Sequence, residues 1–230
     1  MSFSEWIAKV ARDPVSGFTH LAGAVLGLIG LVYLLQLTLP SHDKRNILGA
    51  AVFGMSLIAL YLSSAAYHLL QVSDSARLVL RRIDHALIFT LIAGTYTPFC
   101  LITLRETWGT PILIAIWSIA LVGFGLSVFW IHAPRWLSTA LYLFMGWFIV
   151  IDFGSLTRGL TEGGLYWLVA GGLSYTVGAV VYAVKRPDPF PPHFGFHEIW
   201  HLMVLGGSAC HFMSVVCVLR STRILVPHYL

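Results

Sequence analysis

Residues 197 to 201 read HEIWH, which matches the H-E-x-x-H pattern of zinc proteases. In a helix, His197 and His201 lie four residues apart on one face, where both imidazoles can bind the same metal ion. Glu198 stands where a zinc protease has the glutamate that activates water. Such a pair also occurs by coincidence or for local hydrogen bonding, so a metal site requires further ligands.

Three more polar side chains lie in apolar segments, where polar groups are costly and therefore informative. Ser64 and His68, in SSAAYH, share a helix face near the end of one segment, and Asp84, in RRIDHALIF, begins another. The imidazoles of His68, His197 and His201 would fill three tetrahedral zinc positions and leave the fourth open to water. This is a catalytic pattern rather than a closed structural one.

The composition indicates a membrane protein. Of 230 residues, 57% are hydrophobic and 10% are charged, whereas an ordinary soluble domain has about 25% charged residues. Segments of about 20 apolar residues can cross the bilayer as helices. They lie near residues 17–39, 46–70, 84–104, 110–131, 137–156, 165–184 and 197–219. Because these segments are apolar on every side, we predict an all-α fold, a seven-transmembrane helix bundle that forms a single integral membrane domain over residues 1–230.

Seven consecutive crossings place the end of the second span and the starts of the third and seventh on the same side of the membrane. We therefore expect His68, Asp84 and the His197–His201 pair at one depth, as an intramembrane metal site. A divalent ion bound by three neutral imidazoles keeps two positive charges, which Asp84 and a hydroxide would offset. Without the ion, Asp84 would be an isolated carboxylate in an apolar setting.

Other polar residues allow two interpretations each. Ser64 can take part in the site, or it can hydrogen-bond the carbonyl four residues before it. His20 opens the first span on the same side of the membrane and can lie behind the ligands. His211 lies about 15 Å beyond His201 along a helix, too far to join the site, and is expected to be a hydrogen-bonded interior residue.

The net charge of +4 does not indicate a nucleic-acid partner, because the basic residues are scattered through short loops. In such loops lysine and arginine set the orientation of a membrane protein. Eight of them fall on the amino-terminal side and six on the opposite side. We therefore expect a cytoplasmic amino terminus and a metal site near the cytoplasmic face. The first 18 residues lack the pattern of a cleaved signal peptide, so the first span is expected to remain.

Three motifs, SSAAYH, RRIDHALIFTLIAGTYTP and HEIWHLMVLGGSACHF, resemble those of the bacterial haemolysin III proteins, within the progestin and adipoQ receptor family that includes the adiponectin receptors. More distantly, the chain is similar to the alkaline ceramidases. The resemblance implies zinc bound by His68, His197 and His201, with Asp84 in contact with the zinc-bound water and Ser64 nearby. It also implies that Asp84, rather than Glu198, is the partner of the water. The chain lacks the long amino-terminal extension of the adiponectin receptors.

The resemblance and the residues together favour a zinc-dependent hydrolase of lipid amide or ester bonds, located in the bacterial inner membrane and involved in lipid homeostasis. The acyl chain of a membrane lipid would occupy a cavity among the helices. One alternative is a non-enzymatic sensor or receptor with structural zinc. Two further alternatives are a pore-forming cytolysin, which the scarcity of polar residues in the spans disfavours, and an intramembrane protease that uses Glu198.

Overall fold

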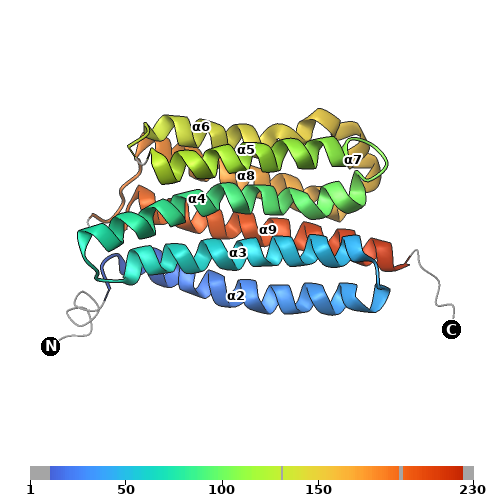
Figure 1. Ribbon diagram of the computed structural model, residues 1–230, viewed down its shortest axis with the longest axis horizontal. Coiled ribbons are helices and arrows are strands. Elements are labelled where there is room, and N and C mark those ends of the chain that lie inside the picture. Colours follow the sequence, from blue (N-terminus) through green and yellow to red (C-terminus); the bar gives the residue numbers. More distant parts are fainter. Residues whose placement is uncertain (1–10, 131, 192–193, 225–230) are drawn as a thin grey trace.

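The computed structural model describes residues 11–130, 132–191 and 194–224, and it shows an all-helical bundle (Figure 1). Seven candidate membrane spans are found in the described part of the chain, which confirms the predicted fold class. The main helices are α2 (Pro14–Thr38), α3 (Lys44–Leu69), α4 (Asp74–Pro98), α5 (Gly109–Phe129), α6 (Arg135–Trp147), α7 (Phe153–Gly159), α8 (Glu162–Val184) and α9 (Phe196–Ile224). Short helical turns follow three of them, at η1 (Leu39–Ser41), η2 (Phe99–Thr103) and η3 (Phe148–Asp152).

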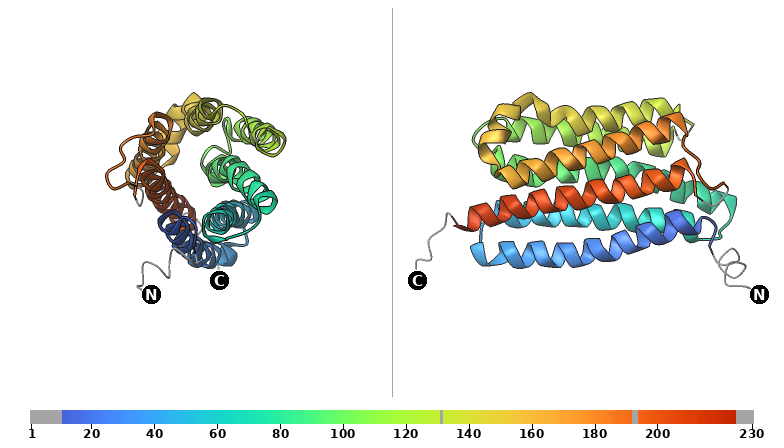
Figure 2. Two further views of the ribbon diagram at one scale, coloured as in Figure 1. Left: turned by 90° about the vertical axis from the view of Figure 1, so that its left-hand side faces the viewer. Right: turned by 180° about the vertical axis from the view of Figure 1, so that it is seen from behind.

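The helices pack mainly against their neighbours in the chain. α2 packs against α3, α3 against α4, α4 against α5, and α8 against α9, while α9 returns to α2 and closes the bundle. Viewed along its long axis, the bundle is a ring of helices (Figure 2). The interior holds a cavity of about 210 Å³ whose walls include side chains of α3, α4, α5, α6, α8 and α9.

Polar residues at the helix starts explain several of the observed boundaries. Asp43 accepts a hydrogen bond from the Arg45 amide and begins α3, and Ser73 does the same for the Ala76 amide at α4. The cap at Ser73 starts the third span before the expected position 84. Asp84 therefore lies inside α4 rather than at its beginning, on a helix that is already well formed.

The fifth span is not one continuous helix. It changes from α6 to the 3₁₀ turn η3 and then to α7, which interrupts the regular α-helical hydrogen bonding. The buried Tyr96 hydroxyl on α4 bonds to the backbone at this break: it donates to the Met145 carbonyl, which also accepts from the Phe148 amide, and it accepts from the Ile149 amide at 2.9 Å. Because an unpaired backbone group costs several kcal/mol in lipid, this one hydroxyl permits the break and fixes α4 against the fifth span.

Replacing Tyr96 by Phe should therefore destabilise the protein by about 1–3 kcal/mol, the cost of leaving buried polar groups unpaired. Thermal unfolding in a fixed detergent would measure the change. Tyr166→Phe is the control, since Tyr166 is exposed. Equal melting temperatures for the two variants would show that Tyr96 does not hold the break.

Candidate metal centre

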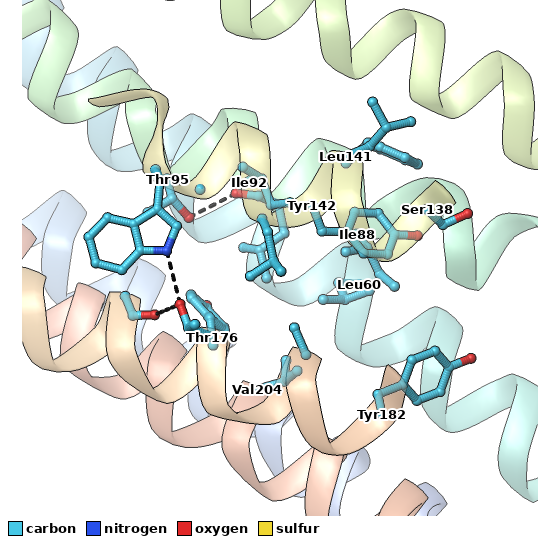
Figure 3. A pocket seen from close by; sticks show the side chains of 18 of the residues that line it. Leu60, Ile88, Ile92, Thr95, Ser138, Leu141, Tyr142, Thr176, Tyr182 and Val204 are labelled. Atoms are coloured by element: carbon cyan, nitrogen blue, oxygen red, sulfur yellow. Dashed lines mark hydrogen bonds between the residues drawn. The ribbon is translucent and has the colours of Figure 1, made fainter. Parts of the chain in front are cut away.

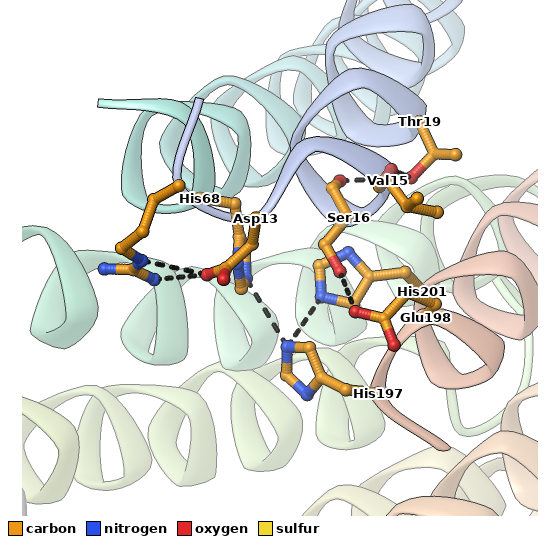
Figure 4. Close-up of polar contacts among 9 residues, drawn as sticks. Asp13, Val15, Ser16, Thr19, His68, His197, Glu198 and His201 are labelled. Carbon is orange, nitrogen blue, oxygen red and sulfur yellow. Dashed lines mark hydrogen bonds and ion pairs between the residues drawn. The ribbon is translucent and has the colours of Figure 1, made fainter. Parts of the chain in front are cut away.

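The three predicted histidine ligands converge at one end of the bundle (Figure 4). His68 comes from the last turn of α3, and His197 and His201 come from the first two turns of α9. The Nε2 atom of His197 lies 3.5 Å from His68 Nε2 and 3.2 Å from His201 Nε2. Tetrahedral zinc with Zn–N bonds of about 2.0–2.1 Å needs ligand nitrogens about 3.4 Å apart. The spacing thus fits such an ion.

The orientation of the rings supports the same conclusion. His68 Nδ1 lies 3.1 Å from the Asp13 Oδ2 atom, which can only accept, so His68 Nδ1 carries a proton and Nε2 faces His197. His197 Nε2 faces both His68 Nε2 and His201 Nε2 and has at most one proton to share between them. A cation at the centre would accept lone pairs from all three rings, and these buried or half-buried histidines can therefore bind a metal ion.

Asp84 and Ser64 lie beside the histidines, at the depth that the topology requires. The Ser64 hydroxyl and the His68 ring both lie close enough to the Asp84 carboxylate to interact with it electrostatically. Both side chains are buried, and both line the central cavity together with His197 and His201. The carboxylate from α4 thus lies at the junction between the candidate metal site and the cavity.

Glu198, the glutamate of HEIWH, makes two hydrogen bonds at the start of α9. Its Oε2 atom accepts a hydrogen bond from the Gly195 amide at 2.8 Å, and its Oε1 atom accepts one from the Ser16 hydroxyl at 3.0 Å. The first contact is half of a capping box at the start of α9. The described residues that line the cavity include Asp84 but not Glu198.

The sequence interpretation missed Arg12 and Asp13, immediately before α2. The Asp13 amide donates to the His68 carbonyl at 2.9 Å, so backbone and side chain both hold the same histidine. Arg12 donates to Asp13 Oδ2 at 2.6 and 2.9 Å and lies over the Tyr67 ring. The hydrogen bond with His68 and the contact with Arg12 lower the pKa of the Asp13 carboxyl to about 2. The carboxylate is therefore ionised at neutral pH.

A weak signal for Asp13 was present in the sequence. Asp-Pro is typical of a helix start, with the aspartate capping the first turn. In the structure Asp13 occupies that capping position, but its side chain makes no capping hydrogen bond and points to His68 instead. The preference of Asp-Pro for a helix start marks where α2 begins, but only the tertiary structure shows that the Asp13 carboxylate contacts His68.

The His20 ring packs directly against the ring of the candidate ligand His201. Its ring centroid is 3.9 Å from that of His201, and its edge packs against Tyr61. His211, in contrast, lies outside the site, with Nδ1 2.8 Å from the Gly207 carbonyl, which confirms its expected place as a hydrogen-bonded interior residue. The first span therefore contributes one ring that packs against the metal ligands.

The fold and this site define a seven-span membrane protein with a buried three-histidine group that can bind metal. A family model described as "Haemolysin-III related" matches residues 8–212, which include all three histidines. The chain belongs to this haemolysin III family, within the progestin and adipoQ receptor family.

Similar proteins occur in bacteria and animals. The chain is 37% identical over 207 residues to the hemolysin-3 homolog of Bacillus subtilis (strain 168), covering 90% of this chain and 94% of that protein. Hemolysin-3 of Bacillus cereus is 36% identical, with 90% and 91% covered. The monocyte to macrophage differentiation factor of Homo sapiens is 30% identical over 210 residues, with 86% and 80% covered.

Metal titration tests the site and the role of Asp13 together. With zinc as the probe, we expect about one ion bound per chain and none in His201→Ala. Asp13→Asn should weaken binding by about 10- to 100-fold, the usual effect of losing the carboxylate behind a histidine ligand. Competition with a chelator would measure the affinity.

Asp43→Asn is the matched control, because Asp43 begins α3 at the end opposite to His68. Equal zinc content in wild type and His201→Ala would eliminate the proposed site. An Asp13→Asn affinity equal to that of Asp43→Asn would eliminate the role of Asp13.

Proposed function

We propose that the protein is a zinc-dependent hydrolase that cleaves the amide or ester bond of a membrane lipid. The observation that carries this proposal is one cavity with a polar end and a long apolar wall. The polar end is lined by the candidate ligands His197 and His201 together with Asp84 and Ser64. A lipid carbonyl can reach the polar end while its acyl chain lies against the remainder. Leu60, Ile88, Ile92 and Val204 belong to this apolar wall (Figure 3).

The chemistry follows from the groups at the polar end of the cavity. A zinc ion held by the three histidines would polarise the substrate carbonyl and acidify water. Asp84 is the general base: it takes a proton from the attacking water as the oxygen adds to the carbonyl carbon. Asp84 then returns the proton to the leaving nitrogen or oxygen as the carbon–nitrogen or carbon–oxygen bond breaks. The products are a fatty acid and an amine or alcohol.

We assign Ser64 a role in positioning Asp84. The Ser64 hydroxyl lies close enough to the Asp84 carboxylate to interact with it, and it can hold that carboxylate at the polar end of the cavity. Another role open to Ser64 is donation to the negatively charged oxygen of the reacting carbonyl. The closeness of Ser64 to Asp84 supports the positioning role.

Neutralising the carboxylates of Asp84 and Glu198, one at a time, separates this proposal from the protease alternative. Asp84→Asn should retain most of the zinc and lower hydrolysis by about 10²- to 10⁴-fold, the usual contribution of a general base. Glu198→Gln, which alters the contacts with Gly195 and Ser16 at the start of α9, should change turnover little. The measurement is release of free fatty acid from a panel of bilayer lipids at matched zinc occupancy.

The same assay can overturn the proposal in three ways. Unchanged activity in Asp84→Asn would show that Asp84 is not the base. Zinc-dependent release from none of the lipids would favour the sensor alternative, in which the metal is structural. Loss of activity in Glu198→Gln alone would instead favour a protease and a peptide substrate.

We further propose that the metal centre faces the cytoplasm of a bacterial cell, on the basis of the eight-to-six distribution of lysine and arginine. Ser75 is exposed in the first turn of α4, at the same end of the bundle as His68. In a variant without native cysteines, Ser75→Cys should resist an impermeant thiol reagent in intact cells and react after lysis. Reaction in intact cells would reverse the orientation.

A further inference from the structure

A second polar group faces the cavity, far from the candidate metal centre. His211 lies ten residues beyond His201 on α9, about 15 Å along the helix axis. Its side chain is 8% exposed, and it belongs to the cavity wall together with Tyr175 of α8. Polar side chains at this depth of a membrane are costly, so they indicate a function.

The hydrogen bonding of His211 leaves one acceptor available. Nδ1 lies 2.8 Å from the Gly207 carbonyl, and since a carbonyl only accepts, Nδ1 carries the ring proton. Nε2 of the neutral ring then presents a lone pair, and no hydrogen bond to it is formed by the residues that the structure describes. A hydrogen-bond donor in the cavity would satisfy this nitrogen.

A row of hydroxyl groups beside His211 can leave one donor available, because the direction of one of its hydrogen bonds can run either way. Tyr61 donates to the Ser208 hydroxyl at 2.6 Å, and the Ser208 and Tyr175 hydroxyls share a second hydrogen bond of 2.8 Å. If Ser208 donates in this second bond, the Tyr175 proton is not used within the row. The Tyr175 ring stacks on His211, with centroids 5.1 Å apart, so donor and acceptor come from adjacent rings.

Two glycines make room for this pair of rings. A Cβ atom at Gly171 would come within 2.3 Å of His211 Nδ1, and one at Gly207 within 2.6 Å of the Tyr175 ring. Both distances are too short for any side chain, so the two rings occupy space that only glycine leaves free. The sequence thus provides specific packing for a polar pair in an otherwise apolar wall.

We propose that His211 and Tyr175 form a subsite for a hydroxyl group carried on the hydrocarbon chain of a lipid. The hydroxyl would donate to His211 Nε2 and accept from Tyr175. An extended chain of C–C bonds near 1.5 Å covers about 15 Å in roughly ten to twelve carbons. The inference builds on the proposed function, because it places the lipid carbonyl at the metal and the hydroxyl near the middle of an 18-carbon chain.

Binding of fatty acids, the expected products, tests the subsite without requiring turnover. The probes are octadecanoic acid and its 3-hydroxy and 12-hydroxy derivatives, added to the zinc-loaded protein in nanodiscs. Wild type should bind the 12-hydroxy acid about tenfold more tightly than the other two, the effect expected of two buried hydrogen bonds. His211→Phe should remove this preference without altering zinc content or the affinity for octadecanoic acid.

Two further variants keep the test decisive. Tyr175→Phe retains the ring and should lose part of the preference even if His211→Phe does not fold. Thr95→Val is the control, since Thr95 lines the cavity but its hydroxyl already donates to the Leu91 carbonyl. Equal affinity of wild type for the three acids would overturn the subsite, as would a preference that survives in both His211→Phe and Tyr175→Phe. A preference without hydrolysis of any lipid would retain the subsite and overturn only the hydrolase.

Discussion

The structure depends on three imidazole nitrogens that face one another inside an apolar bundle. Lone pairs at such spacing repel, and a single shared proton cannot satisfy three of them. A cation resolves the conflict, and its positive charge in turn needs a carboxylate close by, which Asp13 and Asp84 supply from two different elements. The polar residues at this end of the bundle are therefore best understood as one connected group.

α2 is the element that joins this group. The ligands come from α3 and α9, which are distant in sequence, and the beginning of α2 contacts both of them. Asp13 reaches His68 on α3, while Ser16 reaches Glu198 and His20 packs on His201, both on α9. A helix that supplies no ligand itself thus fixes the relative position of the two that do. This explains why the first span contains buried polar residues in an apolar sequence.

Much of this arrangement could be predicted from the sequence. Hydropathy predicts seven spans. The number of crossings between them then places His68, Asp84 and the His197–His201 pair on one side of the membrane. Both predictions need only the order and the length of the spans. Asp13 was missed because its role depends on a contact across 55 positions in the chain. Tyr96 was missed for a related reason: nothing in the sequence of the fifth span marks the break that its hydroxyl satisfies. Glu198 lies at the zinc-protease position by pattern, but only the structure shows that its carboxylate contacts Gly195 and Ser16.

The low burial of the fifth span has an evolutionary consequence. The most apolar window of this span is 11% buried, compared with 50% for the spans of α3 and α9 that hold the histidines. Residues with few protein neighbours tolerate replacement better than closely packed ones. Mutation can therefore reshape the part of the cavity wall that the exposed Val150 and Phe153 provide while the three-histidine group stays intact. Such an arrangement allows cavities of different shape to form around one three-histidine group.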